Sequence, residues 1–161
     1  MKKIKNKNIQ NSPLSPEKYI LKRAKSLPIY KCLLNENWKE AGKAIAVVCR
    51  KHISGNITAG VFLLDLFAYG VRDTFFIFNA TEEEVFEQFE NLEVENFRLT
   101  EVPYVLVHNI IYGAVDFADE HNMKPHPLFP ITSNILEADD EEIEYIDIQF
   151  GMNGQPLFIE V

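Results

Sequence analysis

The longest apolar stretch of the chain, residues 57–79, predicts the centre of a β-sheet. It reads ITAGVFLLDLFAYGVRDTFFIFN, and a run this apolar is typical of strands that are covered on both faces. A glycine at position 70 interrupts it, so we expect one strand before the glycine and another over residues 73–79. The β-branched run 44–52 predicts a further strand, and residues 54–56 supply the tight turn between the two.

Serine, proline and glutamate in succession predict the start of an N-terminal helix. Ser15 can cap the helix, and the proline that follows fits its first turn. We expect this helix to reach Ser26 and to end before Pro28, because the residue that precedes a proline is pushed out of helical geometry. A second, short helix is expected over residues 35–43.

Two more helices are predicted in the middle of the chain. Thr81 and Glu84 have the spacing of a reciprocal capping box, and the apolar residues that follow lie at helical spacing (Val85, Phe86, Phe89 and Leu92). The next helix is expected to open at Thr100, with Pro103 in its first turn, where a missing N–H costs little. Its apolar stripe should end near residues 121–122.

The C-terminal residues EYIDIQFGMNGQPLFIEV predict a β-hairpin. Asn153 and Gly154 suit a two-residue turn that needs positive φ at both positions. The turn fixes a register with three apolar pairs on one face. These pairs are Phe150 with Leu157, Ile148 with Ile159, and Ile146 with Val161.

Together these elements predict an α+β fold with a mainly antiparallel sheet and helices packed on one side. Residues 1–14 are rich in lysine and asparagine and are expected to form a disordered basic tail. Residues 15–161 are expected to form a single α+β domain, since a chain of 161 residues suits one hydrophobic core.

Charge is distributed unevenly along the chain. Nine of the 16 basic residues but one of the 24 acidic residues lie in residues 1–31, so this segment carries +8 and the rest of the chain −16. An acidic body repels nucleic acid, whereas the basic arm can still contact phosphate. The arm can equally fold back on the acidic body or remain solvated.

The two cysteines predict no disulfide and no zinc site. Cys32 and Cys49 belong to no CxxC pair and have no histidine doublet nearby. We expect two separate buried thiols. The basic N-terminus is not followed by an apolar segment, which argues against a secretory signal and for a cytoplasmic protein that does not span a membrane.

Asp65, Asp73 and His108 are the candidate catalytic residues. Two carboxylates and an imidazole can hold magnesium or manganese and activate water on a phosphodiester, with Asp116 and His126 as further candidates. No HExxH, HD or DxD spacing marks such a site. The sequence therefore predicts no metal site and no cofactor, and the metal-dependent phosphodiesterase or nuclease remains the alternative function.

Each candidate also has a structural interpretation. Asp65 can accept backbone N–H groups in the turn over residues 68–71, and Asp73 can do the same or pair with Arg72. His108 can hydrogen-bond a neighbour within the core. Satisfying a backbone donor is worth about 1 kcal/mol, which is enough to retain such a residue without catalysis.

Four segments of the chain resemble an uncharacterised family of small bacterial proteins of the Bacteroidetes type. The segments are SLPIYKCLLNENW, GVFLLDLFAYGVRDTFF, HNIIYGAVDFADEHNMKPHPLF and IQFGMNGQPLFI. Members of this family often have a cysteine at the position of Ala68, so the resemblance excludes a thiol nucleophile there in this chain. It implies a shared fold over about residues 15–161 and no mechanism.

The function that we expect is binding of another macromolecule by a non-enzymatic adaptor or regulatory domain. The sequence lacks GxGxxG, a phosphate-binding loop and a serine elbow. Its basic arm can order on contact with a protein or RNA partner. The expected contact residues are Lys18, Lys22, Arg23 and Lys25. Self-association through an exposed C-terminal strand is a third hypothesis, and the oligomeric state is left open.

Overall fold

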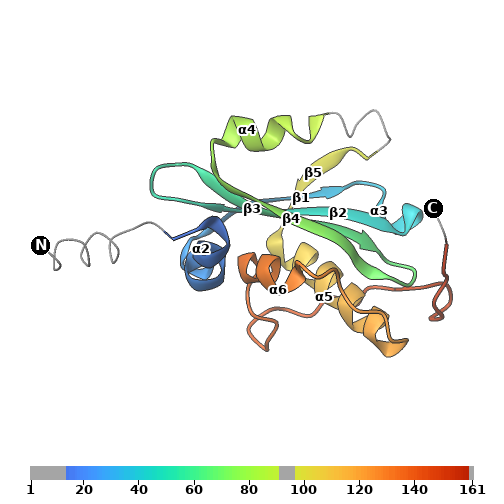
Figure 1. Ribbon diagram of the computed structural model, residues 1–161. Coiled ribbons are helices and arrows are strands. Elements are labelled where there is room, and N and C mark those ends of the chain that lie inside the picture. Colours follow the sequence, from blue (N-terminus) through green and yellow to red (C-terminus); the bar gives the residue numbers. More distant parts are fainter. Residues whose placement is uncertain (1–13, 91–96, 160–161) are drawn as a thin grey trace, which may run out of the picture.

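The computed structural model of the chain describes residues 14–90 and 97–159. The predicted basic tail, residues 1–14, lies outside the described residues except for its last position. Within the described part, five strands form one antiparallel sheet with helices packed against it (Figure 1). The predicted α+β fold class is therefore confirmed.

The sheet has the strand order β4-β3-β2-β1-β5, and each neighbouring pair is antiparallel. The strands are β1 (Ile29–Asn35), β2 (Lys43–Lys51), β3 (Ile57–Asp65), β4 (Gly70–Ala80) and β5 (Leu99–Val102). The first four strands follow one another as a meander. β5 then lies at the opposite edge of the sheet, beside β1.

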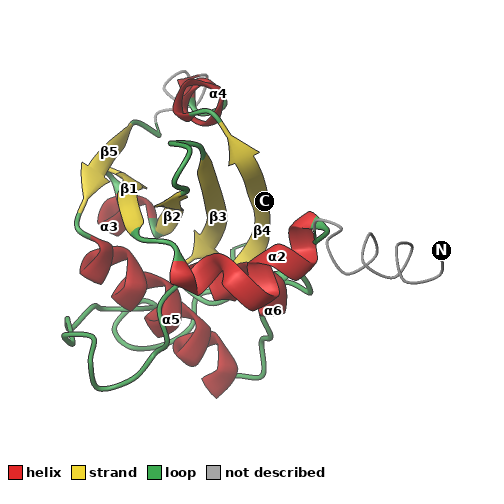
Figure 2. Cartoon of the chain, turned by 90° about the vertical axis from the view of Figure 1, so that its left-hand side faces the viewer, coloured by secondary structure: helices red, strands yellow, loops and turns green. Residues whose placement is uncertain are grey.

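Most of the helical residues lie on one face of the sheet. This layer contains α2 (Pro16–Arg23), α5 (Tyr104–Glu120), α6 (Phe129–Thr132) and two 3-10 turns, η1 (Ala24–Ser26) and η3 (Ser133–Ile135). The short α4 (Glu82–Glu87) lies over the opposite face (Figure 2). A single helical turn, α3 (Trp38–Ala41), connects β1 to β2.

Alternation along β2 divides the core into two layers. Ala46 and Val48 pack toward α5, whereas Val47 and Cys49 belong to the layer that Val85 of α4 completes. All five side chains are fully buried. The central strands are thus covered on both faces, which explains why their sequences are apolar without a polar alternation.

The predicted capping signals are confirmed. The Ser15 hydroxyl accepts a hydrogen bond from the Lys18 N–H at 3.3 Å and starts α2. Thr81 and Glu84 form both bonds of the capping box at the start of α4, at 3.1 Å and 3.0 Å. α5 ends where the stripe predicted, with His121 as its C-cap.

β1 is a strand that the sequence reasoning missed. Residues 29–35 pair with β2 on one side and with β5 on the other, and Leu34 and Asn35 are fully buried. The helix expected over residues 35–43 shrinks to the single turn α3, which Gly42 ends at a φ of 66°. Pairing on both edges outweighs the weak local preference of this segment.

The start of the long helix was predicted too early. α5 begins at Tyr104 with Pro103 as its N-cap, and residues 99–102 form β5 instead. Proline forces the residue before it into extended geometry, so Val102 continues a strand and pairs with Cys32.

The predicted C-terminal hairpin is wrong beyond its turn. Asn153 and Gly154 do have positive φ, and Met152 and Gln155 form an isolated bridge, but no strands flank them in the described residues. Phe150 instead packs its ring against Gly113 of α5. After the turn, the Leu157 N–H donates to the Phe67 carbonyl. Contacts with α5 and with the β3–β4 turn thus replace the strand pairing.

Two residues of the predicted elements lie outside the described residues. They are Val161, which the predicted register pairs with Ile146, and Leu92 of the predicted helix after Thr81.

A buried arginine joins three distant segments below the sheet. Arg50 on β2 is 1% exposed, and its guanidinium donates to the carbonyls of Ile135 and Leu27 at 2.6 Å and 2.5 Å. It also reaches the Glu137 carboxylate at 3.3 Å. A buried cation must have such partners, because burial without them costs several kcal/mol.

We expect Arg50→Met to lower the free energy of unfolding by about 3–5 kcal/mol, because two buried carbonyls lose their donors while the side-chain volume is largely kept. Urea denaturation followed by circular dichroism measures this change. Glu137→Gln is the matched control and should cost less than about 1 kcal/mol, since the Glu137 side chain is 43% exposed and the guanidinium keeps its carbonyl partners. Equal stability of Arg50→Met and the wild type would contradict this account.

Candidate functional site

Asp65 ends β3 and caps the turn that follows it. Its two carboxylate oxygens accept hydrogen bonds from the backbone N–H groups of Phe67 at 3.0 Å and Tyr69 at 3.1 Å. The predicted capping role is therefore confirmed, with donors at positions 67 and 69. Both oxygens are engaged by local backbone, so the carboxylate shapes the β3–β4 turn.

Asp73 lies on the edge strand β4 and is exposed. One of its oxygens accepts from the Thr74 N–H at 2.8 Å and lies 3.6 Å from Nε2 of His126. Nδ1 of His126 accepts from the Leu128 N–H, so Nε2 is the nitrogen that points a proton toward Asp73. Arg72, the partner considered from the sequence, lies over the Tyr69 ring at 4.2 Å instead.

His108 is buried on α5 between a tyrosine and an aspartate. Nδ1 lies 2.7 Å from the Tyr104 hydroxyl, and Nε2 lies 3.0 Å from a carboxylate oxygen of Asp139. The Tyr104 hydroxyl also accepts a hydrogen bond from the Glu137 N–H at 2.7 Å. Burial raises the pKa of Tyr104, so the hydroxyl stays protonated and donates a hydrogen bond to Nδ1. Nε2–H then donates to Asp139.

The next residue of α5 holds the same segment. The Asn109 amide donates to the Glu144 carbonyl at 2.9 Å, and its oxygen accepts from the Ile146 N–H at 3.0 Å. Tyr104, His108 and Asn109 thus fasten residues 137–146 to the helix. The histidine that the sequence offered as a catalytic group therefore acts as part of this attachment.

The three catalytic candidates do not share one centre. Asp65, Asp73 and His108 each have separate partners, and Asp116 stands two turns after His108 on α5. Over residues 14–90 and 97–159, no group of three or more His, Cys, Asp or Glu side chains is placed to hold a metal ion. The metal-dependent alternative stays a prediction without a geometric centre.

The cysteines lie on adjacent strands but on opposite faces of the sheet. Cys32 belongs to the core layer beneath the helices and Cys49 to the other layer, and both thiols are free, as predicted. Burial raises the pKa of each thiol to about 12. Neither cysteine can supply a thiolate nucleophile near neutral pH.

The predicted contact residues form an exposed cationic surface on α2 and η1, which we call the basic α2 surface (Lys18, Lys22, Arg23 and Lys25). Ile20 and Ala24 are fully buried on the other side of the helix and anchor it to the core. None of the four cations takes part in a salt bridge between residues that the structure describes.

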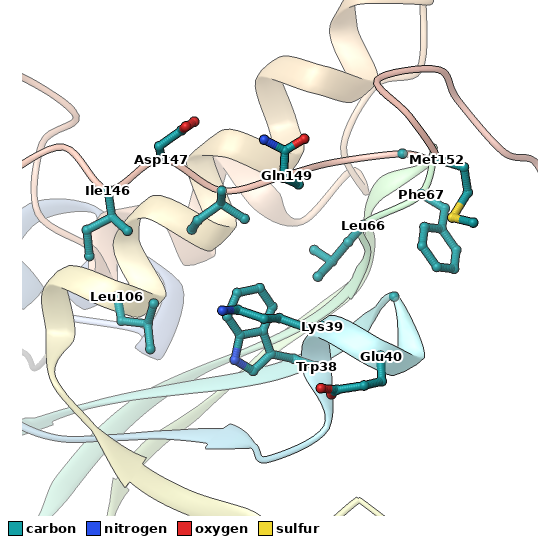
Figure 3. A pocket seen from close by; sticks show the side chains of 13 residues that line it. Trp38, Lys39, Glu40, Leu66, Phe67, Leu106, Ile146, Asp147, Gln149 and Met152 are labelled. Carbon is teal, nitrogen blue, oxygen red and sulfur yellow. The ribbon is translucent and has the colours of Figure 1, made fainter.

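A largely apolar cavity of about 470 Å³ lies between α3, α5 and the C-terminal segment, and we call it the Trp38 groove. Figure 3 shows Trp38 on one side of it, Leu66 and Leu106 at its two ends, and Ile146 approaching from the opposite side. Phe67 and Met152 extend the apolar lining near the β3–β4 turn. The polar residues along the groove include Lys39, Glu40, Asp147 and Gln149.

Comparisons of the chain with family models, with curated proteins and with solved structures found no match. The family resemblance proposed from the sequence therefore stays a prediction. No helix within the described ranges is both long and apolar enough to cross a lipid bilayer.

Sequence reasoning anticipated the basic α2 surface but missed the Trp38 groove. The groove is lined by residues from α3, the β3–β4 turn, α5 and the C-terminal segment, which are far apart in the chain. The predicted hairpin also concealed the groove, because it paired residues 146–150 with a second strand, whereas residues 146–149 line the groove in the structure.

We expect Asp65→Asn to lower the free energy of unfolding by about 1–2 kcal/mol, because an amide has one acceptor oxygen for two backbone donors. Asp73→Asn is the control and should change it by less than about 0.5 kcal/mol, since that side chain is 57% exposed. Both are measured by urea denaturation. A stabilisation by magnesium or manganese that disappears in Asp65→Asn would show that the carboxylate serves an ion instead.

Proposed function

We propose that the protein is a cytoplasmic, non-enzymatic binding domain of the adaptor or regulatory kind, which contacts an acidic segment of a partner protein through the basic α2 surface. One observation carries the proposal. The four cations of this surface are exposed and lack carboxylate partners among the described residues, although the rest of the chain is strongly acidic.

The surface is held by an ordered scaffold. Ile20 and Ala24 pack into the core, and Arg50 binds the Leu27 carbonyl directly after η1. A helix that is already fixed loses little conformational entropy when a partner binds. The backbone that carries the four cations is thus fixed before any encounter.

The same surface offers an apolar contact. Leu21 is 48% exposed and lies within one helical turn of Lys18 and Lys25. Exposed ion pairs contribute about 0.2–1 kcal/mol each, so charge alone supports a weak contact. Burial of Leu21 against the partner would add to the affinity and fix the orientation.

A protein partner fits the charge distribution better than RNA does. Residues 32–161 carry −16, and a polyanion long enough to pass beyond α2 meets that repulsion. A short acidic segment of a protein can contact α2 alone. RNA binding is therefore the outcome against which the proposal is tested.

The test is the triple variant Lys18→Glu/Lys22→Glu/Lys25→Glu. Affinity capture from the producing cell, with quantitative mass spectrometry, should show that the recovered partner proteins fall by about tenfold or more, which corresponds to about 1.4 kcal/mol or more. Circular dichroism should show an unchanged fold, since the three side chains are exposed.

The matched control is Lys43→Glu/Arg98→Glu/Lys124→Glu, which makes the same change in net charge at exposed basic residues outside both α2 and the Trp38 groove. It should leave partner recovery unchanged. Equal recovery with both triple variants would refute the proposed surface. Retention of a single-stranded RNA on a filter by the wild type, lost in the α2 variant, would identify the partner as RNA.

A further inference from the structure

The C-terminal segment that borders the Trp38 groove has unused backbone hydrogen-bonding groups. The N–H and C=O groups of Asp147, Ile148 and Gln149 have no partner within the part of the chain that the structure describes. The segment is fastened on either side, by Asn109 at Ile146 and by the Leu66 carbonyl at Gly151. An ordered backbone with open donors and acceptors is what a pairing strand requires.

The side chains of this segment alternate as they do in a strand. Burial alternates from Tyr145 to Phe150, with the even-numbered residues partly buried and the odd-numbered ones exposed. Figure 3 shows Ile146 directed toward the groove, and Asp147 and Gln149 directed away from it. A strand added beside this segment would send every second side chain in the direction of Ile146, into the groove.

The groove suits apolar side chains. Trp38, Leu66 and Leu106 offer an apolar surface, and the volume of about 470 Å³ has room for more than one side chain of leucine size. Met152 is 51% exposed at one end, so an apolar contact remains open there.

The charges around the groove favour a basic ligand. Glu40 and Asp147 carry negative charge at the groove. The one lysine among the lining residues, Lys39, has its Nζ 5.3 Å from the centroid of the Trp38 ring and offsets one of these two charges. The segment that leads into the groove adds further exposed acids (Asp139, Asp140, Glu141, Glu142 and Glu144). A ligand with lysine or arginine between its apolar residues would meet this potential favourably.

We propose that the Trp38 groove binds an extended peptide segment of another protein by strand addition to residues 147–149. The peptide places apolar side chains at alternate positions into the groove and directs basic side chains toward the acidic rim. Backbone pairing supplies affinity, and the groove supplies the preference for apolar residues.

This site is distinct from the basic α2 surface. α2 and α3 lie toward opposite ends of the sheet, so both surfaces can be occupied at once (Figure 1). The two also differ in sign, because one presents cations and the other lies among carboxylates. A domain that contacts an acidic segment at one end and a basic, apolar strand at the other can hold two partners together.

Trp38, the single tryptophan of the chain, provides the readout. A panel of heptapeptides that lack tryptophan, with lysine alternating with valine, leucine or phenylalanine, is titrated against the full chain while Trp38 emission is followed. We expect at least one peptide to shift the emission with saturation below about 1 mM. Absence of a saturable shift across the panel would overturn the proposal.

Two altered peptides separate the parts of the recognition. N-methylation of alternate backbone amides, on the edge that pairs with residues 147–149, should weaken binding by about tenfold or more, since it removes donors and keeps the side chains. Glutamate in place of lysine should weaken binding to a similar degree. Unchanged affinity of every N-methylated form would overturn strand addition.

Met152→Lys and Ile53→Lys form the matched pair of protein variants. Both replace exposed apolar residues, but Met152 lies at the groove whereas Ile53 lies in the β2–β3 turn. Met152→Lys should weaken the affinity for the peptide by about tenfold, and Ile53→Lys should weaken it by less than about twofold. Equal effects of the two variants would overturn the assignment to the groove. The α2 triple variant should bind the peptide as the wild type does, which keeps this test separate from that of the proposed function.

Discussion

The buried guanidinium of Arg50 is the interaction on which the other features depend. A cation removed from water needs fixed partners, and here they come from Leu27, Ile135 and Glu137. Leu27 follows the helix that carries the basic α2 surface, whereas Glu137 opens the segment that later borders the Trp38 groove. One side chain thus fixes the chain at the origin of both proposed binding surfaces. Within the described residues, no buried side-chain nitrogen or oxygen lacks a hydrogen-bond partner, and the guanidinium of Arg50 is no exception.

The segment after Glu137 is ordered without regular secondary structure. Helix α5 supplies the bonds that strands would otherwise provide, through Tyr104, His108 and Asn109. His108 and Asn109 follow Tyr104 by four and five residues, so the three side chains lie on one side of the helix and can reach successive parts of an extended chain. A buried histidine is often taken as a sign of catalysis, but here Nε2 bonds to Asp139 of the segment and Nδ1 bonds to the Tyr104 hydroxyl, which in turn accepts from the Glu137 N–H.

Local signals in the sequence were reliable, and signals that depend on distant parts of the chain were not. Ser15 and Thr81 bond to N–H groups three residues away, so their caps could be predicted. Asp65 could be assigned to its turn for the same reason. The β1 strand and the fate of Phe150 depend on partners far along the chain, so periodicity alone could not decide them. The basic α2 surface was predictable from charge on one helix, whereas the groove combines four separate segments.

Gly113 influences the shape of the Trp38 groove although it does not line it. Glycine inside a helix costs about 0.5–1 kcal/mol relative to alanine. At this position, however, a Cβ atom would lie 2.5 Å from the Phe150 ring. The helix therefore accepts a weaker backbone preference so that an aromatic ring can rest directly on it. That ring fixes the end of the extended segment. A methyl group added at Gly113 would displace the ring and so shift the wall of a cavity that Gly113 itself does not line. A natural variant of this chain that replaces Gly113 should therefore also have a groove of different shape.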